Sequence, residues 1–217
     1  MLKKIKNILF DADDTLWYDS KYFKVLENTL IKYGNNSGLE IDEIMHTLKE
    51  NLKKEKKGEK GFANAILKTA ITLNFKNVEI KLLRKEVKQF LNHPIELTKG
   101  ITNFLQTSNH ITKVVLTKGI YNEQIKKLEK SGLLPFFDNV IVVAKKNENI
   151  LKSILIILDI NPNETLSIGN SIIHDIGPAI KNKIKSVWFN HNYNYNGRNS
   201  KLPKEALEIN NWNELSI

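Results

Sequence analysis

The sequence predicts a doubly wound α/β fold with a mainly parallel sheet, joined to a small α-helical domain inserted near its start. Short apolar runs alternate with helical patterns from residue 94 onward, which is typical of a parallel sheet with helical crossovers. A similar apolar run, Ile8–Phe10, lies near the start of the chain, and residues 17–93 after it show helical spacing. We therefore expect an α/β core of residues 1–16 and 94–217 and a helical cap of residues 17–93.

Four amphipathic helices are expected in the cap. Apolar side chains recur there at intervals of three and four residues, over residues 22–30, 41–52, 62–71 and 78–91. Gly34 is placed to end the first helix. The fourth helix should stop at His93–Pro94, because a residue before proline avoids the helical region.

Strands and helices should alternate in the core, with right-handed crossovers. The first strand is expected over residues 3–11. The later strands are expected near residues 113–117, 140–143, 165–168 and 187–189, and the helices near residues 101–105, 121–130, 149–158 and 176–180. Residues 190–203 are rich in Asn, Tyr and Gly and predict a loop, and Trp212 and Leu215 should pack the C-terminal segment on the core.

Composition excludes several classes of protein. Hydrophobic residues make up 41% of the 217 residues, yet no apolar run approaches the ~20 residues that a membrane helix needs. No apolar signal region follows the first residues, and the absence of cysteine excludes disulfides and thiolate chemistry. We expect a cytoplasmic protein that is not associated with a membrane and is a monomer or a homodimer.

The net charge of +9 raises the question of a nucleic-acid partner. Nearly all of the basic residues are lysines, with arginine at positions 84 and 198 alone, whereas readers of bases and phosphates favour bidentate arginine. The densest basic run, Lys53–Lys60, is interleaved with Glu and predicts a solvated segment. We therefore do not expect nucleic acid as a partner, and we assign the charge to attraction of an anionic, phosphorylated substrate.

Three carboxylates follow the first predicted strand within four residues: Asp11, Asp13 and Asp14. Like charges at such spacing repel and are costly to desolvate, so the pattern favours a bound cation. Oxygen ligands favour a hard cation such as Mg2+, and the carboxyl ends of parallel strands are where α/β folds bind ligands. The plain alternative is an acidic, solvated turn.

The stretch Asp11-x-Asp13-x-Thr15-Leu16 resembles the first motif of the haloacid dehalogenase (HAD) superfamily, most of whose members are phosphatases. Asp14 stands where the family usually has Gly. The resemblance implies a Rossmann-like core, and the helical insertion directly after the motif matches the family's cap at its first insertion point. Capless magnesium-dependent phosphatases share the Asp-Thr-Leu-Trp ending, so this motif alone does not select the branch.

Three further stretches resemble the family's other motifs. Thr117 matches the Ser or Thr that binds the phosphoryl group, and Lys118 beside it is a further candidate phosphate-binding residue. The family's lysine matches Lys146 or, in another register, Lys145; we favour Lys146. The stretch from Gly169 to Ala179 resembles Gly-Asp-Ser-x-x-x-Asp-Ile-x-x-Ala, with Asp175 as the metal-binding acid and Asn170 where Asp is usual.

The resemblance implies Mg2+-dependent hydrolysis of a small phosphorylated metabolite through an aspartyl-phosphate. Asp11 would be the nucleophile and Asp13 the general acid and base, while Thr117 and Lys146 stabilise charge on the phosphoryl oxygens. Asp11, Asp13 and Asp175 would hold the metal, with Asn170 as a weak or outer ligand.

Other functions remain open on the same motifs. A phosphomutase or phosphotransferase would use the same residues. A dehalogenase would lack the second carboxylate, and a non-catalytic phospho-ligand binding or nucleic-acid-associated protein would be expected to lose Asp11 or Asp13; both are present. The sequence does not name the substrate.

Overall fold

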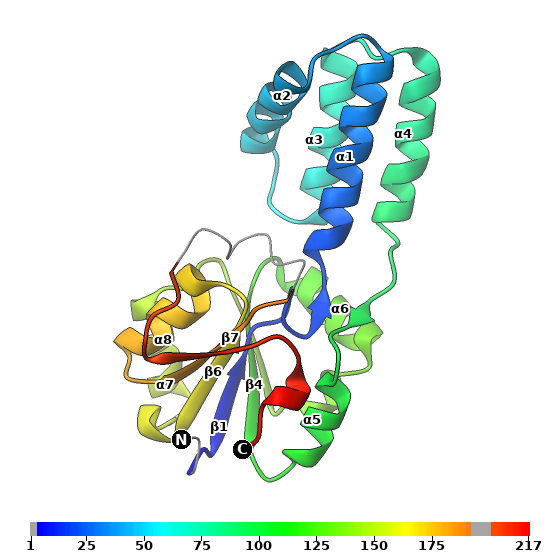
Figure 1. The fold of residues 1–217 in the computed structure, drawn as a ribbon. Coiled ribbons are helices and arrows are strands. Elements are labelled where there is room, and N and C mark those ends of the chain that lie inside the picture. The colour runs from blue at the N-terminus through cyan, green and yellow to red at the C-terminus, as the bar shows by residue number, and fades with distance from the viewer. Residues whose placement is uncertain (1–3, 192–200) are drawn as a thin grey trace. The chain divides into compact units, whose positions relative to one another are not determined.

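The computed structural model describes residues 4–191 and 201–217. The chain divides into two compact units, Met1–Ser20 with Ile95–Ile217, and Lys21–Pro94 (Figure 1). The sequence pattern had placed residues 17–20 in the cap, but here they belong to the α/β unit. The reason is local packing: Trp17 is fully buried in the core of that unit, and β2 (Trp17–Tyr18) pairs antiparallel with β3 (Glu96–Leu97).

The α/β unit contains a six-stranded sheet in the order β5-β4-β1-β6-β7-β8, with every neighbouring pair parallel. This confirms the predicted doubly wound, parallel fold. The strands are β1 (Asn7–Phe10), β4 (Thr112–Lys118), β5 (Asn139–Val143), β6 (Thr165–Gly169), β7 (Lys185–Phe189) and β8 (Ala206–Ile209). β1 lies between β4 and β6, so the end of β1 is at the centre of the sheet (Figure 1).

Helices cover both faces of this sheet. Ile8 and Phe10 of β1 pack in one apolar cluster with residues of α5 and α6, while Leu9 packs in another with residues of α7 and α8. Alternate side chains of a strand point to opposite faces, so the two helix pairs lie on opposite sides of the sheet. The helices are α5 (Ile101–Thr107), α6 (Tyr121–Ser131), α7 (Glu148–Ile157) and α8 (Gly177–Lys181), and a π-helical turn, Ile172–Ile176, precedes α8.

The C-terminal segment packs on the core as predicted. Trp212 is 1% exposed, and its ring lies 5.1 Å from that of Phe189 and 5.7 Å from that of Phe10. Its indole N–H donates to Thr98 Oγ1 at 2.8 Å, which satisfies the polar atom of a buried tryptophan. The sequence pattern missed β8, a short edge strand whose Leu207 is exposed. Most of the loop predicted over residues 190–203 lies outside the described residues.

The helical unit contains four helices, as predicted: α1 (Ser20–Asn36), α2 (Ile41–Lys54), α3 (Glu59–Thr72) and α4 (Asn77–Phe90). The expectation that Gly34 ends the first helix was wrong, because α1 continues through it to Asn36. A Cβ at Gly34 would lie 2.3 Å from Cδ1 of Ile44 and 2.9 Å from Cζ of Phe75. The glycine therefore allows close side-chain packing inside this unit rather than a helix end.

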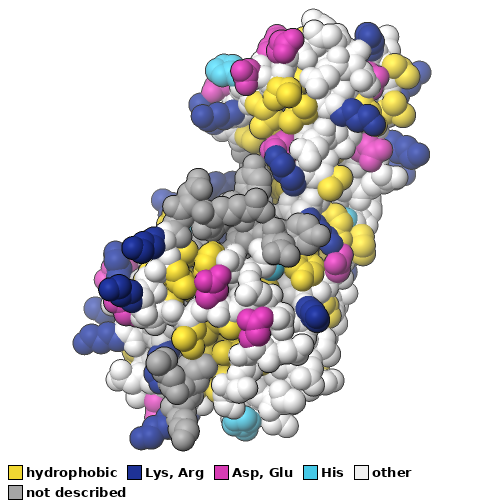
Figure 2. All heavy atoms as spheres, viewed as in Figure 1, with side chains coloured by type: hydrophobic (Ala, Val, Ile, Leu, Met, Phe, Trp, Pro, Cys, Tyr) yellow, Lys and Arg dark blue, Asp and Glu magenta, His cyan; other side chains and the backbone are white. Residues whose placement is uncertain are grey.

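On the face drawn in Figure 2, basic and acidic side chains are intermixed rather than gathered in separate patches. Lys and Arg side chains are spread over both units there, with acidic side chains among them. Among the described helices, none is long and apolar enough to cross a membrane. The expectation that nucleic acid is not a partner stays a prediction.

Candidate active site

The predicted site residues follow the carboxyl ends of neighbouring strands. Phe10 at the end of β1 pairs with Val115 of β4 and with Ile168 of β6. Asp11 directly follows β1, its backbone N–H donates to the Ile168 carbonyl at 2.9 Å, and Thr117 lies near the end of β4. The parallel register therefore places the predicted residues at one edge of the sheet.

A buried lysine lies between two of the predicted carboxylates. Lys146 Nζ donates to Asp11 Oδ1 and, at 2.7 Å, to Asp175 Oδ1. All three side chains are exposed by 11% or less. Lys145, by contrast, is exposed. The fold thus brings Lys146 to Asp11, and we call Asp11, Lys146 and Asp175 the Lys146 centre.

Local structure fixes each member of the Lys146 centre. Asn147, directly after the lysine, caps α7 by accepting the Ile150 N–H at 3.0 Å. Asp175 lies in the π-helical turn before α8, a feature that is frequent at functional sites. Its Oδ2 accepts the Ser171 N–H at 2.9 Å. A Cβ at Gly169 would lie 2.4 Å from Cγ of Asp175, so the carboxylate can take this place because residue 169 is glycine.

The Lys146 centre has more negative than positive charge. Burial and the Asp175 carboxylate raise the pKa of Asp11 and Lys146 opposes them, which leaves the pKa at about 7. Burial lowers the pKa of Lys146, but Asp11 and Asp175 outweigh it and raise the pKa above its ordinary range. Two buried carboxylates that share one lysine form an oxygen donor set suited to a hard divalent cation. The residues present therefore fit Mg2+.

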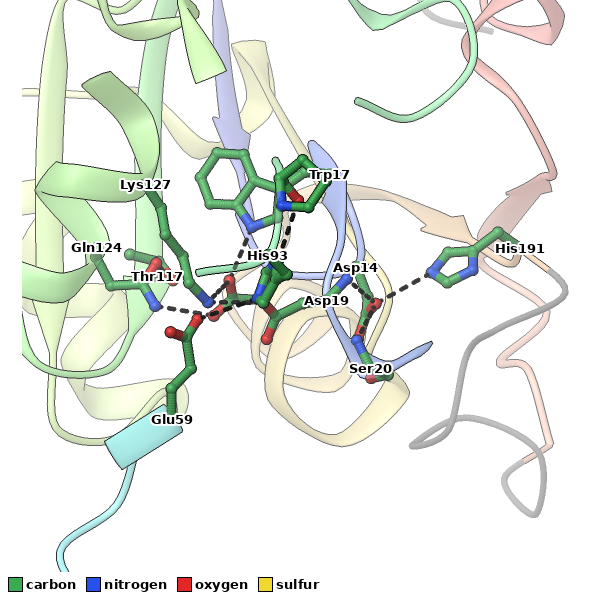
Figure 3. Close-up of polar contacts among 12 residues, drawn as sticks. Asp14, Trp17, Asp19, Ser20, Glu59, His93, Thr117, Gln124, Lys127 and His191 are labelled. Atoms are coloured by element: carbon green, nitrogen blue, oxygen red, sulfur yellow. Dashed lines mark hydrogen bonds and ion pairs between the residues drawn. The ribbon is translucent and has the colours of Figure 1, made fainter. Parts of the chain in front are cut away.

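Asp13 is held by three donors. Oδ1 accepts from the Trp17 indole at 2.9 Å and from Lys127 Nζ at 3.0 Å, and Oδ2 accepts from Gln124 Nε2 at 2.8 Å (Figure 3). Lys127 also donates to Asp19 Oδ1 at 2.7 Å, and we call Asp13, Lys127 and Asp19 the Lys127 centre. Burial opposes the charged form, but Lys127 and the other donors hold the pKa of Asp13 below its ordinary value.

Asp14, at the position where the resemblance expects Gly, has a structural function. Its φ of 58° is left-handed, a region that Asp enters more readily than most residues. Its Oδ1 accepts the backbone N–H groups of Asp19 and Ser20 at 2.9 Å each, and Oδ2 accepts the Ser20 hydroxyl. His191 Nε2 lies 3.8 Å from the same carboxylate (Figure 3). The third carboxylate of the acidic stretch thus fixes the start of α1.

The remaining predicted residues have different surroundings. Thr117 is 1% exposed, and its hydroxyl donates to Gln124 Oε1 at 3.3 Å. Lys118 is exposed at the end of β4. Asn170 is buried, and its carbonyl accepts the Trp188 indole N–H at 2.8 Å. Phosphate binding by Thr117 and Lys118, and metal binding by Asn170, stay predictions.

Sequence reasoning missed Gln124, Lys127 and Asp19. The first two are three residues apart in a predicted helix and therefore share one face of it. That face also carries Leu128, which packs in the apolar core. Two polar side chains on the face of a helix that also carries a core leucine could therefore have identified Gln124 and Lys127 as candidate site residues.

The comparisons with known proteins cover most of the chain. A family model described as "haloacid dehalogenase-like hydrolase" matches residues 5–182. The chain belongs to this family. It is therefore a hydrolase, and the resemblance read from its motifs is confirmed.

Relatives of this HAD-like hydrolase include two archaeal proteins named glyceraldehyde 3-phosphate phosphatase. The protein from Methanocaldococcus jannaschii is 26% identical over 81% of this chain and 80% of its own length. The protein from Pyrococcus furiosus is 25% identical over 88% of this chain and 82% of its own length. A HAD-like family hydrolase from Xanthomonas campestris has a similar fold, with a TM-score of 0.77, 23% identity, and coverage of 96% of this chain and 91% of that one.

Proposed function

We propose that this hydrolase is a Mg2+-dependent phosphatase that hydrolyses a small phosphomonoester through an aspartyl-phosphate on Asp11. The observation that carries the proposal is the Lys146 centre, in which a buried lysine contacts both Asp11 and Asp175. A cation there offsets the repulsion between the Asp11 carboxylate and an anionic phosphoryl group. The names of the archaeal relatives support the same reaction class.

Asp11 is the nucleophile in this proposal. Lys146 holds one of its oxygens, and the Thr15 hydroxyl donates to the other at 3.2 Å. Attack on phosphorus forms the Asp11–phosphorus bond and releases the alcohol, and water then cleaves the aspartyl-phosphate. The covalent intermediate divides one difficult hydrolysis into two easier steps.

Asp13 transfers the proton in both steps. Its donors lower the pKa of Asp13, so Asp13 must take up a proton with the anionic substrate; it gives that proton to the leaving oxygen in the first step and removes one from the attacking water in the second. This side chain also separates a phosphatase from a dehalogenase, which has no leaving alcohol to protonate. General acid–base catalysis supplies only ~10²–10⁴-fold, whereas acceleration of monoester hydrolysis can reach ~10²¹-fold. Positioning and charge stabilisation must therefore contribute most of the acceleration.

Lys146 and Thr117 stabilise the transferring phosphoryl group. The ammonium group of Lys146 remains charged between its two carboxylates, so its third N–H can donate to a phosphoryl oxygen. The Thr117 hydroxyl lies near the end of β4, the strand beside β1. It would donate to another phosphoryl oxygen on leaving Gln124 Oε1, its present acceptor. Lys118, exposed beside it, would contribute longer-range attraction to an anionic substrate.

Asp11, Asp175 and the backbone carbonyl of Asp13 would hold Mg2+, with Asn170 as a weak or outer ligand. When bound, Mg2+ would add positive charge that lets the anionic phosphoryl group approach Asp11. Gly169 supports this site by leaving space for the Asp175 carboxylate.

The substrate we propose to test first is a triose phosphate, because the archaeal relatives are named for glyceraldehyde 3-phosphate. The cytoplasmic location and the monomeric or homodimeric state that the sequence led us to expect both stay predictions.

The experiment is a phosphate-release assay on the purified full chain. A panel of phosphomonoesters that includes glyceraldehyde 3-phosphate is incubated with Mg2+ or with excess chelator, and Asp11→Asn is the control for a contaminating phosphatase. We expect phosphate release that needs both Mg2+ and Asp11. Full activity in chelator contradicts the metal requirement, and transfer of the phosphoryl group to a second alcohol without free phosphate would identify a phosphotransferase.

A further inference from the structure

The side chain of Gln124, near the start of α6, links two groups of the site. Nε2 donates to Asp13 Oδ2 at 2.8 Å, and Oε1 accepts from the Thr117 hydroxyl at 3.3 Å (Figure 3). An ionised carboxylate can only accept hydrogen bonds, so the amide nitrogen must face Asp13 and the amide oxygen must face Thr117. The orientation of the Gln124 amide is therefore fixed by its partners.

Gly119 leaves space for the Gln124 side chain. A Cβ at residue 119 would lie 3.0 Å from Nε2 and 3.1 Å from Cγ of Gln124, closer than ordinary van der Waals contact. The glycine follows β4 directly, so the end of the strand and the Gln124 side chain pack together. The backbone thus supports Gln124 from one side while Asp13 and Thr117 bind its amide.

Lys127 holds the other oxygen of Asp13. Its Nζ lies 3.0 Å from Asp13 Oδ1 and 2.7 Å from Asp19 Oδ1. Residues three apart lie on the same face of a helix, so one face of α6 provides a donor to each Asp13 oxygen. Trp17, which also donates to Oδ1, provides a third contact.

We propose that Gln124 and Lys127 are positioning residues that hold the Asp13 carboxylate in the orientation from which it exchanges a proton with the leaving group. The role rests on the proposed phosphatase function. Both residues donate to Asp13, while Gln124 also accepts from Thr117 and Lys127 also binds Asp19. Catalysis depends steeply on such placement, since a displacement of 1 Å can lower a rate by roughly 10²-fold.

The test uses two variants that keep side-chain length but remove the donor, Gln124→Met and Lys127→Met. Lys126→Met is the matched control, because Lys126 is exposed on the same helix. We measure kcat and KM on an alkyl phosphate and on p-nitrophenyl phosphate, whose leaving group needs little protonation. We expect kcat on the alkyl phosphate to fall about tenfold or more in both variants, with a smaller fall on the aryl phosphate and KM within about twofold.

A double-mutant cycle with Asp13→Asn separates positioning from general stability. If Gln124 acts through Asp13, Gln124→Met should cause little further loss in the Asp13→Asn background. Lys127→Arg, which keeps the charge, should recover part of the activity lost in Lys127→Met. If a Met variant fails to fold, Gln124→Asn or Lys127→Gln makes the same test, because each shortens the side chain and withdraws the donor from Asp13.

Equal losses on both substrates, or losses that add fully to that of Asp13→Asn, overturn the positioning role. If the wild-type enzyme is active and both Met variants keep its kcat, the positioning role is wrong while the proposed function stands. A wild-type chain that releases no phosphate from either substrate defeats the proposed function, and the positioning role with it.

Discussion

The α/β unit contains two lysines that each lie between two carboxylates, and the two centres differ in their other partners. Lys146 joins Asp11 and Asp175, and Lys127 joins Asp13 and Asp19. In the Lys127 centre, the Asp13 carboxylate also accepts hydrogen bonds from two neutral donors, Gln124 and Trp17. Around Asp11, the neutral side-chain donor is the Thr15 hydroxyl at 3.2 Å.

This difference explains the opposite pKa directions of the two catalytic candidates. Burial and Asp175 raise the pKa of Asp11 to about 7, whereas Lys127 and its neutral partners outweigh burial and lower the pKa of Asp13. Hydrogen bonds to a charged carboxylate stabilise it, and a second carboxylate nearby does the opposite. The Asp13 carboxylate is therefore well compensated, whereas the other carboxylate of each centre is not: burial raises the pKa of both Asp11 and Asp19 to about 7, against the opposing charge of the lysine.

The largest expected effect is in the Lys146 centre. Asp11→Asn keeps the shape of the side chain but removes the nucleophile, so turnover should fall on the order of 10⁴-fold or more, as for other covalent catalysts. Phosphate release from the best substrate, with Mg2+ present, measures it. Near wild-type turnover in this variant would rule out the aspartyl-phosphate.

Asp13→Asn should have the next largest effect, and its size should depend on the substrate. We expect a loss of about 10²–10⁴-fold on alkyl phosphates and a smaller loss on aryl phosphates, because a good leaving group needs less protonation. Steady-state kinetics on one substrate of each kind measure the difference. The same loss on both would assign Asp13 a structural or metal-ordering role instead.

Lys146→Ala should lower turnover by at least ~100-fold, which corresponds to ~3 kcal/mol of transition-state stabilisation. Lys145→Ala is the matched control, since that neighbouring side chain is exposed and should contribute little. Both variants are assayed at saturating Mg2+. A reversed pattern would move the role to Lys145, and two mild variants would leave the proposed site without its lysine.

Gly169→Ala should have the smallest of these effects and should act through Asp175. The new Cβ would lie 2.4 Å from the Asp175 carboxylate carbon, so the carboxylate must move. We expect turnover to fall about tenfold and the Mg2+ concentration for half-maximal activity to rise, with overpacking lowering the free energy of unfolding by about 1–3 kcal/mol.

Gly34→Ala is the matched control for this overpacking. Its Cβ would meet Ile44 and Phe75 in the helical unit, so it should lower the melting temperature without changing the Mg2+ dependence. An unchanged Mg2+ dependence in Gly169→Ala as well would contradict the view that Gly169 makes room for a metal-binding carboxylate.

The sequence predicted most of the fold because burial leaves a local pattern. The later strands and the helices of the core lie close to their predicted positions, as do the four cap helices, whereas the first strand, expected over residues 3–11, is limited to Asn7–Phe10. The failures have physical causes. Gly34 looked like a helix end but serves packing, Trp17 to Ser20 looked like the start of the cap but belong to the core unit, and the exposed edge strand β8 has little apolar signal.

The sequence by itself determined the order of the motifs and the strand ends that carry them, because those residues stand directly beside apolar strands. It did not decide between Lys145 and Lys146, since neighbouring lysines differ only in which one the turn before α7 directs inward. The tertiary structure also decided the partners of Asp13. Lys127 lies 114 positions away in the chain and binds Asp13 because α6 packs on the same sheet face as Ile8 and Phe10, and no local pattern encodes that contact.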